Sequence, residues 1–172
     1  MTPKPLNPLL RYVLPVGVVL GLFFNSATPD DTLDRYVGAY PCAGQDQFFR
    51  DPRVISALRK ALGVDYMAYE EHRSFSGCGK IERFGEYLFV DISELHVGGY
   101  TSFVFVPANN GSAYVFWLKQ QVGGPYQIYG NRPVPPIIMT RIEQEMNTQW
   151  GHVATFKATG DKLESVMMPR KQ

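Results

Sequence analysis

The chain has 172 residues, of which 45% are hydrophobic and 13% aromatic, and its formal net charge is +1 at neutral pH. This length suits one domain with a sizeable core, and the composition excludes a disordered or fibrous protein. Because the net charge is close to zero and no basic stripe is interleaved with aromatic residues, nucleic-acid binding has no electrostatic basis.

Residues 1–27 have the pattern of an export signal. Two basic residues precede an apolar run over residues 12–24, and the small residues Ser26 and Ala27 follow it. The run is shorter than the roughly 20 residues that a membrane-spanning helix needs, and it contains Pro15. These features favour a cleaved signal and a periplasmic protein. An uncleaved inner-membrane anchor is the alternative, and it is the only membrane contact expected.

Residues 28–44 are predicted to be a linker and an N-terminal arm, with a short strand or extended segment at 36–40. Cys42 lies in this arm, and Cys78 is the only other cysteine of the chain. A single cysteine pair in an exported protein is most simply a disulfide, and loop-closure entropy makes such a bridge worth roughly 3 to 4 kcal/mol. Two cysteines without CxxC spacing do not suit a zinc site, so no metal or other cofactor is predicted.

Two consecutive helices are predicted after the arm. Asp51 followed by Pro52 is a good helix start, because an aspartate accepts hydrogen bonds from free backbone N–H groups and proline suits the first helical position. Apolar residues then recur at helical spacing until Gly63, which is expected to end the helix. A second helix is expected to begin at Asp65 and to end near His72.

From residue 80 the hydrophobic pattern has a period of two, and turn signals separate five short strands. This succession predicts an antiparallel meander. The candidate strands are Lys80–Phe84, Tyr87–Ile92, Tyr100–Val106, Ala113–Leu118 and Tyr126–Tyr129. Tyr114, Phe116 and Trp117 cannot all face one way on a strand, so these aromatic residues are expected to lie half in the core and half on an exposed face.

A third helix is predicted from Ile137 to about Trp150. Ile138, Ile142 and Met146 share one of its faces, so this helix is expected to lie on the sheet.

The last predicted strand is at 153–157, and a tail follows over residues 161–172. The sequence therefore predicts an α+β domain over residues 45–160, in which an antiparallel sheet of about five strands in a meander carries helices packed on one face.

The chain is predicted not to be an enzyme, because it contains no hydrolase motif, phosphate-binding loop or dinucleotide-binding loop. A thiol nucleophile at Cys78 with His72 or His96 as its base is an alternative, but a disulfide is the commoner use of one cysteine pair in an exported protein. A glycosidase needs a pair of carboxylates, and the candidates lie on helix and turn faces expected to be solvated: Glu70, Glu71, Glu82 and Glu86.

The most distinctive stretch is a polar, glycine-ended loop between the second and third predicted strands. Its candidate partner-binding residues are Ser93, Glu94, Leu95, His96, Val97, Gly98, Gly99 and Tyr100. The two glycines suit the tight return of a hairpin, since glycine adopts positive φ at little steric cost. A hairpin tip that carries a histidine has a shape suited to entering a cleft of another protein. The alternative is that His96 is an ordinary polar loop residue.

Three stretches, which together cover about residues 45–150, carry a resemblance to a known family. The first is the predicted helix with its glycine stop at 51–66, and the second is the strand, histidine-containing loop and strand at 90–106. The third is Tyr126-Gln127-Ile128-Tyr129-Gly130, which leads into the helix that ends at Trp150. In the order of these stretches and in their residues, the chain resembles the Ivy-type periplasmic inhibitors of vertebrate (C-type) lysozyme.

The family's inhibitory loop has the pattern Cys-Lys-Pro-His-Asp-Cys followed by glycine, with its two cysteines bridged. Laid on this sequence, the histidine falls on His96 and the glycine on Gly99. The two cysteines fall on Ser93 and Gly98, and the proline falls on Leu95. This loop therefore has no internal bridge, so the cysteine pair of the chain lies elsewhere.

The resemblance implies an exported cell-envelope protein that binds a peptidoglycan-cleaving enzyme such as C-type lysozyme and inhibits it by inserting His96 into the active-site cleft. A raised-pKa glutamic acid and an aspartate line that cleft, and an imidazole has the reach to hydrogen-bond both. The alternative is an immunity protein or another envelope binding module on the same scaffold, with a partner other than lysozyme. A homodimer is also open.

Overall fold

The computed structural model describes residues 32–42, 47–94, 100–119, 125–150, 155–159 and 162–166. The predicted export signal at 1–27 lies outside these residues, so the signal and its cleavage stay predictions. Among the described helices, none has both the length and the apolar character needed to cross a membrane.

An eight-stranded antiparallel sheet forms the middle layer of the domain. Its strands lie in the order β1–β3–β4–β5–β6–β8–β7, and β2 pairs with β3 outside this path. The strand bounds are β1 Ser76–Cys78, β2 Glu82–Phe84, β3 Tyr87–Glu94, β4 Tyr100–Pro107, β5 Tyr114–Trp117, β6 Tyr126–Tyr129, β7 Thr155–Thr159 and β8 Lys162–Val166.

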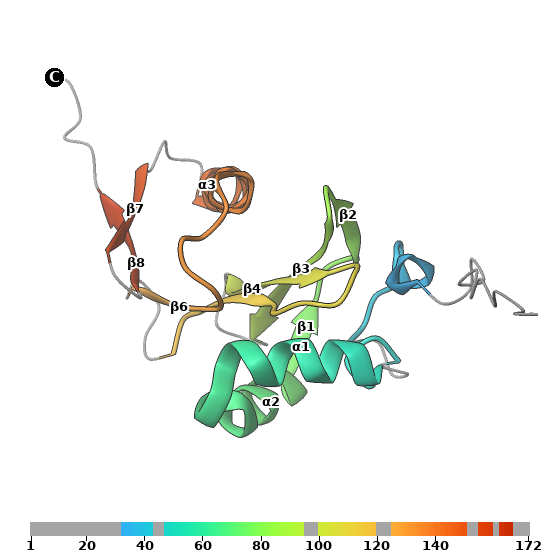
Figure 1. Cartoon of the computed structure of the whole chain (residues 1–172). Helices are drawn as coiled ribbons and strands as arrows, with labels where there is room; N and C mark the ends of the chain where they lie inside the picture. The colour runs from blue at the N-terminus through green and yellow to red at the C-terminus, as the bar shows by residue number, and fades with distance from the viewer. Residues whose placement is uncertain are drawn as a thin grey trace, which may run out of the picture.

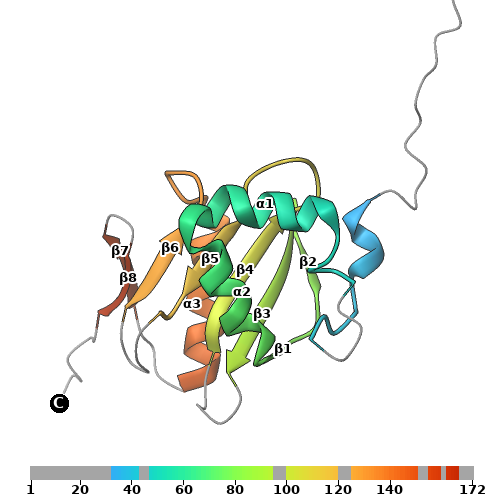
Figure 2. The same ribbon diagram turned by 90° about the horizontal axis from the view of Figure 1, so that it is seen from below.

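Helices cover both faces of this sheet (Figure 1). On one face lie α1 (Pro52–Leu62) and α2 (Tyr66–Ser74), which the short 3₁₀ turn η3 (Gly63–Asp65) connects. On the other face lies α3 (Pro136–Trp150). A further 3₁₀ helix, η2 (Leu33–Tyr36), belongs to the N-terminal arm and lies at the edge of the sheet where β1 and β2 are found (Figure 2).

The α+β class and the meander from β2 to β6 confirm the prediction. Packing of the helices on one face holds for α1 and α2 but not for α3, because the central strands β3, β4 and β5 carry buried apolar side chains on both faces. The sheet also has more strands than the five expected. β1 was not predicted, and residues 162–166, assigned to the tail, form β8.

Side chains of one strand alternate between two separate cores. Along β3, Leu88 and Val90 pack with α1 and α2, whereas Tyr87 and Phe89 pack with α3. The whole of β5 is buried, with Val115 and Trp117 in the first core and Tyr114 and Phe116 in the second. The expectation that half of these aromatic residues would be exposed is therefore wrong.

The start of α1 follows its local sequence signal. The Asp51 carboxylate accepts a hydrogen bond from the backbone N–H of Arg53 at 2.9 Å, and Pro52 occupies the first helical position. The helix ends at Gly63, whose φ of 56° is a conformation that favours glycine. This clean start and stop fix where the chain turns into α2.

The N-terminal arm is part of the folded domain. Leu33 is only 2% exposed, and residues 33–36 form η2, which overlaps the extended segment predicted at 36–40 only at Tyr36. After η2, the arm makes two backbone hydrogen bonds of 2.8 Å, from Gly38 N–H to the Ile81 carbonyl and from Ile81 N–H to the Ala39 carbonyl. The predicted disulfide between Cys42 and Cys78 is confirmed.

Candidate functional site

The predicted hairpin is present in its stem. β3 and β4 have eight residues each, the greatest length among the described strands, and they pair from Tyr87 opposite Pro107 to Ser93 opposite Tyr100. Of the predicted partner-binding residues, Ser93, Glu94 and Tyr100 therefore lie at the ends of the two strands. The other five lie outside the described residues: Leu95, His96, Val97, Gly98 and Gly99.

A β-bulge lies at the base of the loop-bearing end. Ile92 is opposite Ser102 but Ser93 is opposite Tyr100, so Thr101 is an extra residue on β4. A bulge bends its strand and increases the local twist, which re-aims the residues beyond it. The bulge therefore interrupts the β3–β4 register next to the ends of the two strands that carry the loop.

A buried hydrogen bond fixes the base of the hairpin to α2. The hydroxyl groups of Tyr69 and Ser102 lie 3.0 Å apart, and both residues are fully buried. Burial raises the pKa of the Tyr69 hydroxyl well above its ordinary value, so this group stays neutral and can donate. Sequence reasoning missed this pair, because neither residue carries a motif and they are far apart in the chain.

A charged cluster lies between α3 and the edge of the sheet. The Arg141 guanidinium pairs with Glu82 at 2.7 Å and with Glu145 at 2.6 Å, and its Cζ lies 4.5 Å from the centroid of the Phe89 ring. The Glu82 side chain is 49% exposed, as the sequence predicted for a solvated carboxylate. The spacing of Arg141 and Glu145 by four residues is the only sequence signal that announces this cluster.

Asp91 adds a third carboxylate to the Arg141 cluster. Burial is the main cause that raises the pKa of Asp91, and the nearby charge of Glu82 raises it further. Burial likewise raises the pKa of Glu145, against the opposing effect of Arg141. Three carboxylates thus lie around one guanidinium in this cluster.

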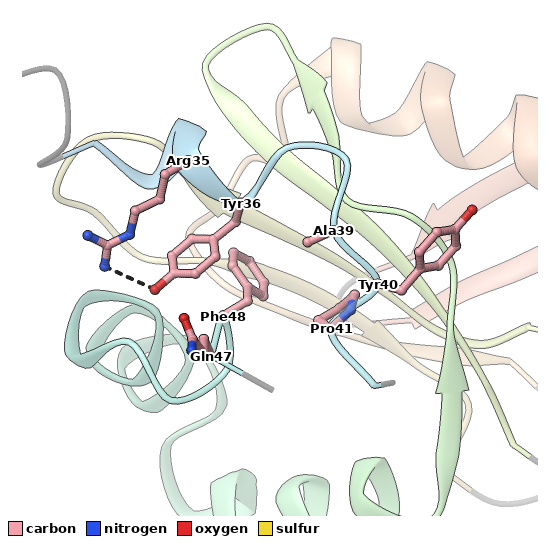
Figure 3. Close-up of a pocket in the computed structure, with 7 residues that line it drawn as sticks. All are labelled: Arg35, Tyr36, Ala39, Tyr40, Pro41, Gln47 and Phe48. Carbon is pink, nitrogen blue, oxygen red and sulfur yellow. Dashed lines mark hydrogen bonds between the residues drawn. The ribbon is translucent and has the colours of Figure 1, made fainter. Parts of the chain in front are cut away.

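A hollow of about 390 Å³ lies under the N-terminal arm (Figure 3). Its lining residues are Arg35, Tyr36, Ala39, Tyr40, Pro41, Gln47 and Phe48. The Arg35 guanidinium donates to the Tyr36 hydroxyl at 3.0 Å and to the buried Asp51 carboxylate at 2.9 Å. The side chain of Arg35 is therefore engaged in attaching the arm to the start of α1.

Asp51 is the centre of that attachment. Hydrogen bonds from Arg53, followed by the one from Tyr36, lower the pKa of the Asp51 carboxyl to about 2, although burial opposes them. The carboxylate thus stays charged at any pH near neutrality. This arrangement is typical of a structural ion pair and N-cap, and it leaves no polar group of Asp51 directed at a ligand.

Chemistry that would need a free thiol or a bound metal has no site among the described residues. Cys78 is bonded to Cys42, so it is not the free nucleophile that a cysteine enzyme requires. Within the described ranges, no three His, Cys, Asp or Glu side chains come together in a way that could hold a metal ion. The Arg141 cluster is an ion-pair network at the edge of α3.

Together these features define an α+β domain that presents the end of a long β-hairpin beside a disulfide-bonded arm. No family model, curated protein or solved structure matches the chain. The resemblance to the Ivy-type inhibitors therefore stays a prediction that rests on the residues quoted above.

Proposed function

We propose that this protein is an exported cell-envelope protein that binds and inhibits a peptidoglycan-cleaving enzyme such as C-type lysozyme. The observation that carries the proposal is the β3–β4 hairpin, whose pairing continues as far as Ser93 opposite Tyr100. Antiparallel partners have Cα atoms about 4.5 to 5.5 Å apart, so both ends of the loop at 95–99 start from one narrow stem. A narrow stem suits insertion into a cleft.

The chemistry of inhibition would depend on the imidazole of His96. A neutral imidazole has one nitrogen that donates and one that accepts a hydrogen bond. The cleft of a C-type lysozyme holds a carboxylic acid, which donates, and a carboxylate, which accepts. One imidazole between them satisfies both groups and at the same time occupies the space of the scissile bond. Binding of this kind needs no catalytic residue on the inhibitor.

The disulfide supports an exported location. Disulfides persist in oxidising compartments and are rare in the reducing cytosol, and the bond between Cys42 and Cys78 joins two segments of the folded domain. The export signal expected at 1–27 agrees with this compartment. A periplasmic site of action places the protein where peptidoglycan-cleaving enzymes meet their substrate.

The test is a cell-wall clearing assay with C-type lysozyme and the purified exported domain. We expect His96→Ala to weaken inhibition by roughly thirtyfold or more, the effect of truncating a central interface residue. The surface variant Lys60→Ala, which changes the exposed side of α1, should inhibit as the wild type does. If His96→Ala keeps full potency, His96 is not the inserted group.

A second measurement separates lysozyme inhibition from the alternative partner. The immobilised domain is offered C-type lysozyme together with a bacterial amidase and a bacterial muramidase at equal concentrations. Retention of lysozyme supports the proposal. Retention of a bacterial enzyme alone would overturn C-type lysozyme as the target and favour an immunity protein on the same scaffold.

A further inference from the structure

The outer edge of β3 is covered by two short strands. β2 pairs with the first part of β3, from Tyr87 to Phe89. β1 pairs with its last three residues, so that Ser76 lies opposite Glu94 and Cys78 lies opposite Ile92. On the other side of the hairpin, β5 pairs with β4 only as far as Ser102 opposite Trp117. Among the described strands, β1 is therefore the neighbour that supports the loop-bearing end of the hairpin.

β1 is a weak support by itself. It has three residues, Ser76, Gly77 and Cys78, and short edge strands that contain glycine have little side-chain packing to hold them in place. Its other described attachments are the hydrogen bond from the Ser76 hydroxyl to the His72 carbonyl at 3.0 Å and the one from Gly79 N–H to the Asp91 carbonyl at 2.9 Å. The Cys42–Cys78 disulfide adds a covalent constraint on this strand.

The N-terminal arm provides this constraint. Its two hydrogen bonds with Ile81 set Ala39 beside Ile81 in an antiparallel arrangement. Three residues farther along the arm, Cys42 is bonded to Cys78, with a Cα–Cα distance of 5.3 Å. The arm thus runs along the outside of the segment from Cys78 to Ile81 and covers an edge that would otherwise be open.

The arm is in turn fixed to the body of the domain. Leu33 is buried in the core that α1 and α2 form with the sheet, and the Tyr36 ring packs edge-on against Phe48 at 5.5 Å. Arg35 pairs with Asp51 at the start of α1. A continuous connection therefore runs from α1 through the arm and the disulfide to β1, and from β1 to the end of β3.

We infer that the Cys42–Cys78 disulfide is a positioning clamp that holds the loop-bearing end of the β3–β4 hairpin, so that binding by this end requires the oxidised cysteine pair. The binding part of this inference rests on the proposed function. Pre-organisation lowers the entropy that is lost on association. In this chain, the rigidity comes from a bridge next to the stem and not from a bridge inside the loop.

The test uses hydrogen exchange on the full domain with both cysteines replaced, Cys42→Ser/Cys78→Ser. We expect the backbone amides of 76–79 and 92–94 to exchange at least about tenfold faster than in the wild type, while the β4–β5 ladder changes much less. The matched control is Leu58→Ala, which leaves the disulfide intact and opens a cavity in the core under α1. This control should not accelerate exchange at the stem selectively.

If the double variant does not fold, a milder variant tests whether the clamp exists. Leu33→Ala weakens the anchor of the arm but keeps the disulfide, and it should accelerate exchange at 76–79 and 92–94 to a smaller degree. If either variant accelerates exchange only within the arm, at 32–42, the clamp is overturned and the disulfide merely anchors the arm.

Inhibition of C-type lysozyme by the same variants tests the consequence for binding. We expect Cys42→Ser/Cys78→Ser to inhibit at least tenfold more weakly than Leu58→Ala, mainly through faster dissociation. Equal potency of these two variants would overturn the requirement for the oxidised pair. If the wild type itself does not bind lysozyme, the proposed function fails, while the exchange data still decide whether the clamp exists.

Discussion

The two faces of the sheet are built from the same strands but from different kinds of side chain. The face under α1 and α2 is mainly aliphatic, with residues such as Leu88, Val90 and Val104. The face under α3 is mainly aromatic, with Phe89 and Phe105 among its rings. Because successive residues of a strand point to opposite faces, an alternation of phenylalanine and valine along β4 is enough to separate the two.

The two faces also differ in the number of carboxylates that lie near a guanidinium. Aromatic rings attract a guanidinium over their faces, and Arg141 lies over Phe89 with three carboxylates nearby. In the core with α1 and α2, Arg73 lies over Phe49, with its Cζ 4.0 Å from the ring centroid, and pairs with the single carboxylate of Glu70. The buried polar contact there is the neutral pair of Tyr69 and Ser102. The α3 face thus carries carboxylates with raised pKa values, whereas the hydroxyl pair of Tyr69 and Ser102 at the base of the hairpin carries no charge.

The largest expected effect separates the two faces at neighbouring positions of β3. Phe89→Ala should lower the free energy of unfolding by about 3–5 kcal/mol and Leu88→Ala by about 2–5 kcal/mol, because both side chains are fully buried. Only Phe89 should couple to the guanidinium. In denaturant-unfolding cycles with Arg141→Ala, we expect a coupling of about 0.5–2 kcal/mol for Phe89 and none for Leu88. Equal coupling at both positions would mean that the Phe89 ring contributes packing but no specific attraction to the Arg141 guanidinium.

The next effect tests the polar contact on the aliphatic face. Tyr69→Phe leaves the Ser102 hydroxyl buried without its partner, so we expect a loss of about 1–3 kcal/mol in urea unfolding. The double variant Tyr69→Phe/Ser102→Ala removes both polar groups and should recover most of that loss. If the two substitutions are simply additive, the hydroxyl pair is not a coupled contact.

Local signals made much of the fold predictable. Asp51 and Gly63 mark the two ends of α1 by chemistry that acts within a few residues, as an N-cap and as a residue at positive φ. Aromatic and β-branched residues flank the loop at 95–99 on both sides, so the stem of the hairpin followed from composition. The placement of the loop residues themselves is still a prediction.

The features that the sequence did not predict depend on contacts between distant parts of the chain. Ser76-Gly77-Cys78 has no strand pattern, and it pairs because the end of β3 offers free backbone groups. The pairing of Arg35 with Asp51, and of Arg141 with Glu82, joins residues far apart in the chain. One signal was available, since strands that are apolar at both odd and even positions indicate that both faces are covered.

The smallest expected effect is the pH dependence of stability, which distinguishes the α3 face from the arm. Burial raises the pKa of Asp91 and of Glu145 above their ordinary values of 3.8 and 4.5. The folded protein therefore holds these protons more tightly than the unfolded chain. Their contribution is fully present below those ordinary values and is lost as the pH rises through the raised ones, so mild acidification from neutral pH should stabilise this face.

The contribution of Asp51 to stability depends on pH in the opposite direction. Its pKa is lowered to about 2 from 3.8, so its contribution is present above pH 3.8 and is lost as the pH falls through about 2. We expect Asp91→Asn to reduce the gain in the free energy of unfolding on mild acidification, by on the order of 1 kcal/mol or less. We expect Asp51→Asn to reduce the loss of that free energy in strong acid. Urea unfolding across pH 2 to 7 measures both. If Asp91→Asn left the mild-acid limb unchanged, the charges of the carboxylates around Arg141 would be compensated by solvent, and the two faces would differ in packing alone.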